Sequence, residues 1–400
     1  MVFAAPEVSQ PHIAAVGFDA HQIAAPRLGA LTGYLPAPKR RSLAERTLRA
    51  AQAAGHILND GFDTVLADVR PDLVILDCEH HSAIQRSIMA RHAILLLSFI
   101  YQTAPGPRRP PLNSAILPGR GIAGSALGVR AAWAALAFRK RVALARAGWA
   151  HWGADLAAAH RALAKRLSLD LGAITTPAGF QMPWSYRLPT LFVLSDKADL
   201  PGPLAPFQSY AGPMILRTRV AAAQDAQVQA FLADVPGTRR VYVAFGSIRK
   251  PPAPFITALM EVARRNPDLR FLVGGMDADA PKPDTVTCVP WAPQLAALEV
   301  ADAAIFHGGA GTLNECLVTS TPMLIYPNAL DGKGNGARVV HHGLGTVGGY
   351  SDDADRIEAD LKAVLGSETI RANMKAHQAH AQQIVDDRLA EKAVERALTP

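Results

Sequence analysis

The sequence predicts an α/β protein made of two units, each with its own parallel β-sheet. The chain has 400 residues, enough for two domains at roughly 150 residues each. Short, uninterrupted apolar runs alternate with alanine-rich helical stretches, which is typical of parallel strands covered by helices on both faces. These runs form two series, one before and one after about residue 215.

The strands of the first series are expected at 73–76 and 94–97, with a helix over 78–90 between them. The second series has strands at 241–245, 271–273, 303–306 and 323–326. Each run is short and is followed by glycine, proline or a helical stretch.

The predicted domains are residues 1–213 and 214–400. The stretch 200–213 is rich in proline and glycine and lacks periodicity, as expected of a linker. Residues 367–397 show a helical pattern, and we expect this last helix to pack back on the N-terminal domain.

Composition excludes several classes of protein. No apolar run of 18 or more residues avoids charge, so no spanning helix is expected, and the first residues do not form a signal peptide. The cysteines, Cys78, Cys288 and Cys316, are far apart, which indicates a reducing, cytoplasmic location and no zinc site. The net charge of +7 comes without a recognisable nucleic-acid-binding module.

Two segments can be interpreted in more than one way. Residues 119–124 fit G-x-G-x-x-G, but a proline-rich loop precedes them and a basic stretch stands where an acidic residue would be needed, so we do not expect a dinucleotide site there. Residues 126–149 form a helix with several arginines. Such a helix either covers a core with its basic side in solvent or makes peripheral contact with the inner membrane surface.

The candidate chemistry lies in a glycine-rich turn after the strand at 303–306. Residues 307–312 read His-Gly-Gly-Ala-Gly-Thr and lead into a helix expected to begin near Thr312. Backbone N–H groups and the helix dipole favour phosphate there, and glycines let a ligand approach closely. Glu315, one turn further on, is placed to accept two sugar hydroxyls. The alternative is a plain strand-to-helix turn capped by Thr312.

A longer pattern resembles the C-terminal signature of the family 1 glycosyltransferases, the UDP-glucosyl and macrolide glycosyltransferase group. Its parts are W-x-P-Q, then H-x-G-x-x-[ST]-x-x-E, then a proline and an aspartate. The matching residues are Trp291, Pro293, Gln294, His307, Gly309, Thr312, Glu315, Pro322 and Asp331. Phe245-Gly246-Ser247 resembles the F-G-S that opens the family's second domain, and Tyr210-Ala211-Gly212-Pro213 resembles its domain junction.

The resemblance implies a GT-B fold of two facing Rossmann-like domains, and it implies roles by position. Trp291 would stack on the nucleotide base, with Gln294 nearby, and Glu315 would hold the ribose. The diphosphate would be held by His307, Thr312, Gly246, Ser247 and the amides of the turn, including Gly309 and Gly311. Asp331 would contact the transferred sugar. No metal or further cofactor is implied, since the helix dipole and the histidine stabilise the leaving diphosphate.

The acceptor half resembles the family less completely. Residues 71–77, ending in Asp77, resemble the strand whose aspartate orients the catalytic histidine; alternatively Asp77 caps a helix. The family's G-H-x-x-P loop has no counterpart, and the first residues resemble the family's second strand. The N-terminal domain is thus expected to lack its first strand and helix, which implies a start upstream or an inactive relic. His80 and His81 are substitute candidates for the base.

The expected function is an inverting hexosyltransferase that moves a sugar from an NDP-sugar to a hydroxyl of a lipophilic small molecule. The segment 107–149 would line the acceptor pocket. Gly332 follows Asp331 where the family usually has glutamine, which leaves a deoxysugar on TDP as an alternative to UDP-glucose. Two further hypotheses are a nucleotide-sugar-binding relic and a UDP-sugar epimerase.

Overall fold

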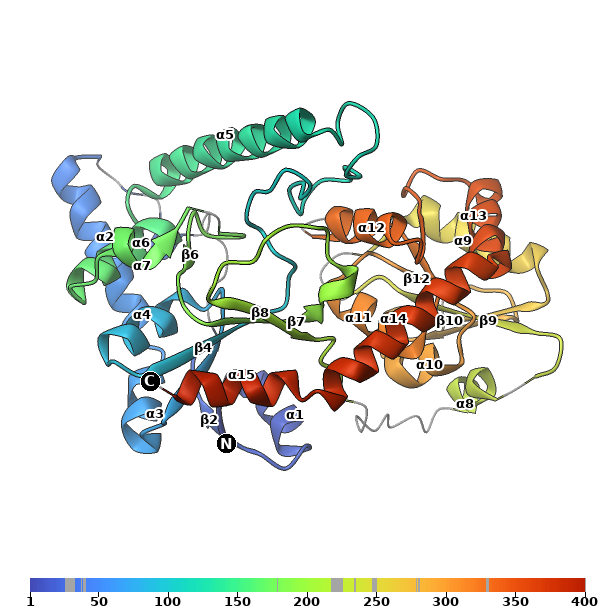
Figure 1. The fold of residues 1–400 in the computed structure, drawn as a ribbon, viewed down its shortest axis with the longest axis horizontal. Helices are drawn as coiled ribbons and strands as arrows, with labels where there is room; N and C mark the ends of the chain where they lie inside the picture. The colour runs from blue at the N-terminus through green and yellow to red at the C-terminus, as the bar shows by residue number, and fades with distance from the viewer. Residues whose placement is uncertain are drawn as a thin grey trace.

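The protein is represented by a computed structural model. It describes residues 1–25, 33–36, 38, 41–177, 179–216, 226–233, 235–246, 250–277, 279, 281–328 and 331–399. Figure 1 shows two α/β lobes side by side, with the N-terminal part of the chain in blue and green and the C-terminal part in yellow to red.

The C-terminal lobe is built on a six-stranded parallel sheet. Its strands are β9 (Arg239–Ala244), β10 (Leu269–Gly274), β11 (Val286–Val289), β12 (Ala303–Phe306), β13 (Met323–Ile325) and β14 (Gly345–Val347). The order across the sheet is β11-β10-β9-β12-β13-β14. This is the 3-2-1-4-5-6 order of a Rossmann domain, in which the connections reverse direction between the first and fourth strands.

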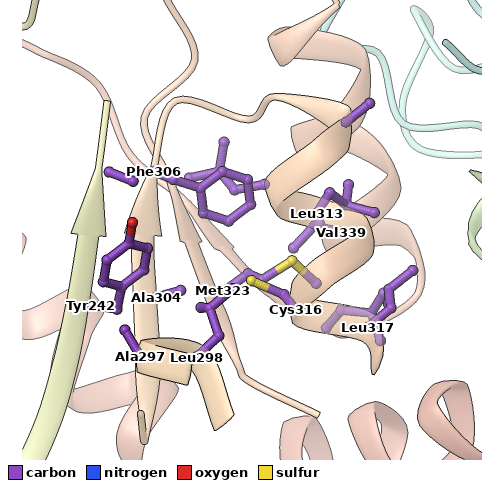
Figure 2. Packing of buried hydrophobic residues seen from close by; sticks show 14 of the residues in the cluster. Tyr242, Ala297, Leu298, Ala304, Phe306, Leu313, Cys316, Leu317, Met323 and Val339 are labelled. Atoms are coloured by element: carbon purple, nitrogen blue, oxygen red, sulfur yellow. The ribbon is translucent and has the colours of Figure 1, made fainter. Parts of the chain in front are cut away.

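Helices cover both faces of this sheet. They are α8 (Ala226–Leu232), α9 (Ala253–Arg265), α10 (Gln294–Val300), α11 (Ala310–Thr319), α12 (Gly332–His341) and α13 (Ala354–Gly366). The helices α9 and α13 close one core. On the other face, Tyr242, Ala304 and Phe306 pack against Leu313 and Cys316 of α11 (Figure 2). Continuous apolar strands are expected when both faces are buried.

The N-terminal lobe contains a four-stranded parallel sheet in the order β3-β4-β7-β8. Its strands are β3 (Leu73–Asp77), β4 (Ala93–Ser98), β7 (Thr190–Ser195) and β8 (Gln208–Gly212). A separate parallel pair is formed by β1 (Val2–Ala5) and β2 (Asp19–Gln22), and β5 (Thr175–Thr176) pairs with β6 (Ser185–Tyr186).

The helices of this lobe are η1 (Glu7–Ser9), α1 (Gln10–Ala14), α2 (Leu43–Leu58), α3 (Phe62–Val69), α4 (His81–Met89), α5 (Ala126–His151), α6 (Leu156–Arg166), α7 (Leu171–Ile174) and η2 (Asp196–Ala198). The helices α2 and α6 pack together over a small alanine- and leucine-rich core. The long helix α5 runs along the upper edge of the molecule in Figure 1, above the rest of its lobe. No helix among the described ranges is long and apolar enough to cross a membrane.

Two helices at the end of the chain, α14 (Glu368–Asp386) and α15 (Leu389–Leu398), return from the C-terminal lobe to the N-terminal sheet (Figure 1). On α15, Ala393 packs in a cluster with Leu95 of β4, Leu191 of β7 and Ala211 of β8. One sheet face of the N-terminal lobe is therefore covered by the C-terminal end of the chain.

The sequence-based elements differ from the structure at three places. The last helix, expected over 367–397, is broken into α14 and α15 at Arg388, which has a φ of +53°. The composition of 200–213 predicts a linker, but Gln208–Gly212 forms the edge strand β8, because Ala211 and Gly212 lie buried against β7. The helix expected near Thr312 begins at Ala310, with Gly309 as its N-cap, and no side-chain cap bond is formed. The alternative in which Thr312 caps the helix is therefore wrong.

Candidate active site

The site is centred where the strand order of the C-terminal sheet reverses. Ligands of doubly wound α/β domains bind at this point, beyond the carboxyl ends of the strands. Gly246 follows β9 and His307 follows β12, and these strands are neighbours in the sheet. A Cβ atom on Gly246 would lie 2.8 Å from Cε1 of His307. The histidine ring is thus packed directly against a glycine backbone.

The turn from β12 to α11 is compact and has one open side. A Cβ on Gly309 would lie 2.6 Å from Nε2 of His307, so the second side of the ring is also closed by a glycine. Gly308 has a φ of +85°, which favours glycine. At Gly311, by contrast, a Cβ would meet no described atom within 4 Å. Position 311 in the first turn of α11 therefore faces open space, and no side chain caps the amides of this turn.

His307 carries an unsatisfied polar atom. Among the residues that the structure describes, its buried Nδ1 has no hydrogen-bond partner. Burial lowers the pKa of His307, and the backbone of Ala244 and the charge of Asp331 partly oppose this shift. A neutral imidazole next to a helix N-terminus can still donate one hydrogen bond to an anion.

Gln294 connects α10 to α11. Its Nε2 donates to Oγ1 of Thr312 at 3.2 Å and to Oε2 of Glu315, and its Oε1 accepts from the hydroxyl of Tyr242 at 3.1 Å. The residues predicted to bind the donor thus include three, Gln294, Thr312 and Glu315, that the structure joins in one network.

Trp291 lies just before this network in the chain. Its side chain is 67% exposed, although a large aromatic ring normally gains by burial. The following residue, Ala292, is buried. The ring of Trp291 is therefore available for stacking, as the base-binding role would require.

Asp331 stands at the N-terminus of α12, close to the glycine-rich turn. Nδ2 of Asn335 donates to Oδ2 of Asp331 at 2.8 Å and to the carbonyl oxygen of Gly308 at 2.7 Å. Burial raises the pKa of Asp331, and the bond from Asn335 opposes the shift. Asn335 therefore holds the carboxylate next to the turn.

Gly332 stands where the family usually has glutamine, and the close approach of the backbone around it leaves no room for a side chain. A Cβ on Gly332 would lie 2.7 Å from the carbonyl oxygen of His307, and one on Gly308 would lie 2.8 Å from the carbonyl oxygen of Gly332. The turn and α12 approach so closely here that a side chain at either position requires the backbone to shift. Ser247, also predicted to bind the donor, lies outside the described residues.

Asp77 lies at the carboxyl end of β3. Its Oδ1 accepts a hydrogen bond from the backbone N–H of Glu79 at 2.7 Å, and the N-cap of the following helix is His80. Asp77 therefore closes a short turn and does not cap a helix, which rules out the alternative role. Among the described residues, no histidine is hydrogen-bonded to its carboxylate.

The two substitute histidines differ in their surroundings. His81 is buried among His160, Trp184 and Tyr186, and its Nε2 lies 3.4 Å from Oε2 of Glu79. Burial lowers the pKa of His80 to about 4. His80 is therefore a weak base at neutral pH.

An apolar cavity of about 380 Å³ lies beside α5 in the N-terminal lobe. Leu112, Trp133, Leu136 and Phe180 supply apolar lining, and Lys140 closes one side by donating to the carbonyl oxygens of Gly179 and Phe180 at 2.6 and 3.0 Å. Leu112 also contacts the C-terminal lobe, because a Cβ on Gly334 of α12 would lie 2.1 Å from its carbonyl oxygen. The cavity wall therefore adjoins the helix that begins at Gly332, directly after Asp331.

Comparisons with known proteins agree with this architecture. Residues 276–395 match the family model of the erythromycin biosynthesis protein CIII-like C-terminal domain. The chain is 33% identical over 119 residues to oleandomycin glycosyltransferase of Streptomyces antibioticus, a match that covers 29% of this chain and 27% of that protein. It is 44% identical over 77 residues to zeaxanthin glucosyltransferase of Pantoea ananas, which covers 19% of this chain and 18% of that protein. These matches span less than a third of either relative.

Solved structures resemble the chain over nearly its whole length. The glycotransferase of kitacinnamycin superposes with a TM-score of 0.66 at 17% identity, covering 99% of this chain and 90% of that one. The spinosyn rhamnosyltransferase SpnG, complexed with thymidine diphosphate, superposes with a TM-score of 0.60 at 16% identity, covering 98% of this chain and 91% of that one.

The class of protein follows from fold and comparison together: this is a GT-B protein with two Rossmann-like domains. The family match over residues 276–395 agrees with the resemblance of the C-terminal motif to the family 1 glycosyltransferases.

The sequence analysis assigned no role to two residues of this region. The hydroxyl of Tyr242 donates to Gln294, and nothing in an apolar strand run distinguishes a tyrosine that makes such a contact. Asn335 ties Asp331 to the turn. Its position four residues after Asp331, one turn along a helix, was a usable signal.

Proposed function

We propose that this protein is a glycosyltransferase that moves a sugar from a nucleoside diphosphate sugar to a hydroxyl group of a lipophilic small molecule, with inversion at the anomeric carbon. The arrangement of Trp291, the Gln294–Thr312–Glu315 network and the open N-terminus of α11 at the sheet's reversal point carries the proposal. This arrangement places an aromatic ring for stacking, a carboxylate that accepts hydrogen bonds from hydroxyl groups, and an anion site within one domain.

In this proposal the donor lies along the carboxyl edge of the C-terminal sheet. Trp291 stacks on the base, Glu315 accepts from the ribose hydroxyls, and the first turn of α11 with His307 binds the diphosphate. Asp331 accepts from the sugar hydroxyls. The acceptor oxygen forms a bond to the anomeric carbon while the bond from that carbon to the diphosphate breaks. The helix N-terminus stabilises the charge that grows on the leaving group.

The apolar cavity beside α5 is the proposed acceptor site. It is enclosed mostly by apolar side chains and lies next to the N-terminal end of α12, so a bound hydroxyl compound would lie on the Asp331 side of the donor. Oleandomycin glycosyltransferase and zeaxanthin glucosyltransferase are named for a macrolide and a carotenoid, and a lipophilic acceptor for this chain agrees with both.

The acceptor proton requires a base, and Asp77 is the proposed residue. A carboxylate at the end of β3 can take this proton directly or orient another base. The weak basicity of His80 and the burial of His81 argue against either histidine.

A second candidate function, nucleotide-sugar binding without turnover, is favoured by one observation. Among the described residues, the carboxylate of Asp77 has no histidine partner.

The deciding experiment measures nucleotide release from UDP- and TDP-sugars by the full chain, with a panel of lipophilic alcohols and phenols, alongside calorimetric binding of UDP and TDP. Acceptor-dependent release that is lost in Asp77→Asn supports the transferase. Binding without release supports the second candidate, and acceptor-independent epimerisation of the donor would contradict both.

A further inference from the structure

The long helix α5 has a second apolar face that the fold leaves uncovered. Leu127, Phe138 and Trp149 are 76%, 67% and 60% exposed. They are spaced by 11 residues, which is about three turns of an α-helix, so they lie along one line on the helix surface. The small residues Ala131 and Ala145 are exposed at helical spacing between them. The stripe formed by these five residues is roughly 33 Å long.

Positive charge flanks the stripe. Arg130 and Arg141 each follow an exposed apolar residue by three positions, which places them along the same edge, and Arg139 and Arg146 lie along the other. Arg41 adds a guanidinium 4.3 Å above the ring of Trp149. The segment 80–154 contains ten lysines and arginines and no aspartate or glutamate, so the rest of the chain is acidic overall.

The opposite face of α5 lines the apolar cavity. Trp133, Leu136 and Lys140 point into the apolar cavity, and Nε1 of Trp133 donates to the carbonyl oxygen of Arg109 at 2.7 Å. One helix therefore separates the cavity from the exposed stripe. It lies along an edge of the molecule, away from the C-terminal lobe's sheet (Figure 1), where a flat surface can reach it.

We infer that the stripe on α5 docks this protein on an anionic membrane surface. A helix with an apolar stripe bordered by arginines lies in the plane of the lipid headgroups, with its apolar side chains inserted and its guanidinium groups on the lipid phosphates. Tryptophan at the end of the stripe suits this interface. Charge complementarity selects a lipid surface over a neutral apolar partner, because an apolar protein face would leave the four flanking arginines without counter-charges.

The docking does not depend on the proposed activity, but it gives that activity a route for its acceptor. A lipophilic compound dissolved in the bilayer would reach the cavity from the other side of the same helix.

The test is co-sedimentation of the full chain with vesicles of phosphatidylcholine alone, and with vesicles in which about a third of the lipid is phosphatidylglycerol. We expect binding to the anionic vesicles only, weakened by salt. Leu127→Ala with Phe138→Ala should weaken binding at least tenfold. Arg130→Gln with Arg141→Gln should weaken it by about fivefold for each arginine.

Matched controls come from the other end of the chain. Val385→Ala and Arg388→Gln change residues of similar exposure and should leave vesicle binding unchanged. Thermal melting and nucleotide binding report whether the α5 variants remain folded.

Three results would overturn the inference: no binding to any vesicle, equal binding by the α5 variants, or a dimer in solution that Phe138→Ala converts to a monomer. The last would assign the stripe to self-association. None of these results concerns nucleotide release, so none of them tests the proposed function.

Discussion

At the scale of single residues, the proposed donor site depends on how closely the backbone approaches His307 and on the space left beside Gly311. The ring of His307 is held between the backbones of Gly246 and Gly309, which leaves little freedom for it to turn. Its unpartnered Nδ1 and the open space at Gly311 lie on the same turn. A phosphate group placed there would satisfy both the ring and the helix amides.

Glu315→Gln tests the ribose contact. The amide keeps the volume of the side chain but loses its charge, so UDP binding should weaken by about 1.5–3 kcal/mol, the range for hydrogen bonds to a charged group. Calorimetry measures the change. Asp360→Asn, which alters a buried carboxylate on α13, is the control and should not affect UDP binding. Unchanged affinity in Glu315→Gln would remove Glu315 from the site.

Trp291→Ala tests the stacking role. Loss of a base–aromatic stack should cost about 1–3 kcal/mol of nucleotide affinity, while the melting temperature should hardly change because the ring is largely exposed. Trp149→Ala removes a similarly exposed tryptophan from the other lobe and serves as the control. A large drop in melting temperature for Trp291→Ala would instead indicate a packing role.

The sequence predicted a donor site over residues 291–331, because this segment combines a motif of specific residue types with a strand-to-helix turn, and the binding roles of its residues stay predictions. The residues that hold these side chains in place were less predictable. Tyr242 and Asn335 act through contacts between segments that are far apart in the chain or on neighbouring turns, and spacing alone does not reveal such contacts.

At the scale of elements, a buried ion pair joins the two lobes. Arg338 of α12 donates from Nε and Nη2 to Oδ1 of Asp199, at 2.9 and 2.5 Å, and its guanidinium lies 4.5 Å above the ring of Tyr101. The hydroxyl of Tyr210 donates to the other carboxylate oxygen. Burial and the charge of Asp199 together raise the pKa of Tyr210 well above its usual value, so the phenol stays protonated and remains a donor.

Arg338→Met should destabilise the protein by about 3–5 kcal/mol, because it leaves the carboxylate of Asp199 buried without its partner. Urea unfolding measures the loss. The double variant Arg338→Met, Asp199→Asn should recover part of it. As a control, Arg264→Met breaks an exposed pair with Glu261, which should cost less than about 1 kcal/mol. Equal effects of the two single variants would show that the interlobe pair contributes little.

The element order was largely predictable. Apolar runs such as 303–306 predicted their strands correctly, because a strand of a parallel sheet that is buried on both faces is apolar along its whole length. The strand β8 was missed because its residues lie in a segment whose proline and glycine content favours a linker, and only its pairing with β7 makes it a strand.

At the scale of the whole molecule, buried histidines make stability depend on pH. Burial lowers the pKa of His80 and His377 to about 4 and also lowers the pKa of His160, His307 and His342. Unfolded histidine titrates near 6.5, so the unfolded chain binds more protons than the folded one as the pH falls below that value.

Stability should therefore be full above about pH 7 and should decline as the pH falls from about 6.5 towards 4. The raised pKa values of Asp77 and Asp331 act in the opposite direction, but they involve fewer groups. Urea midpoints measured across this range give the slope. His377→Gln should reduce the slope, while His12→Gln, at an exposed position, should not. A midpoint independent of pH would show that the buried histidines can be protonated without cost.

The close approach of Gly334 to the backbone of Leu112 has a consequence for exchanging parts between related proteins. Helix α12 of the C-terminal lobe has no side chain at this point, and the wall of the apolar cavity contacts it here. Consider a chimera whose C-terminal half comes from a relative with a larger residue at this position. The larger side chain would displace the cavity wall or separate the two lobes at this contact. Recombination should therefore transfer the 103–113 loop together with α12, so that the two surfaces remain a matched set.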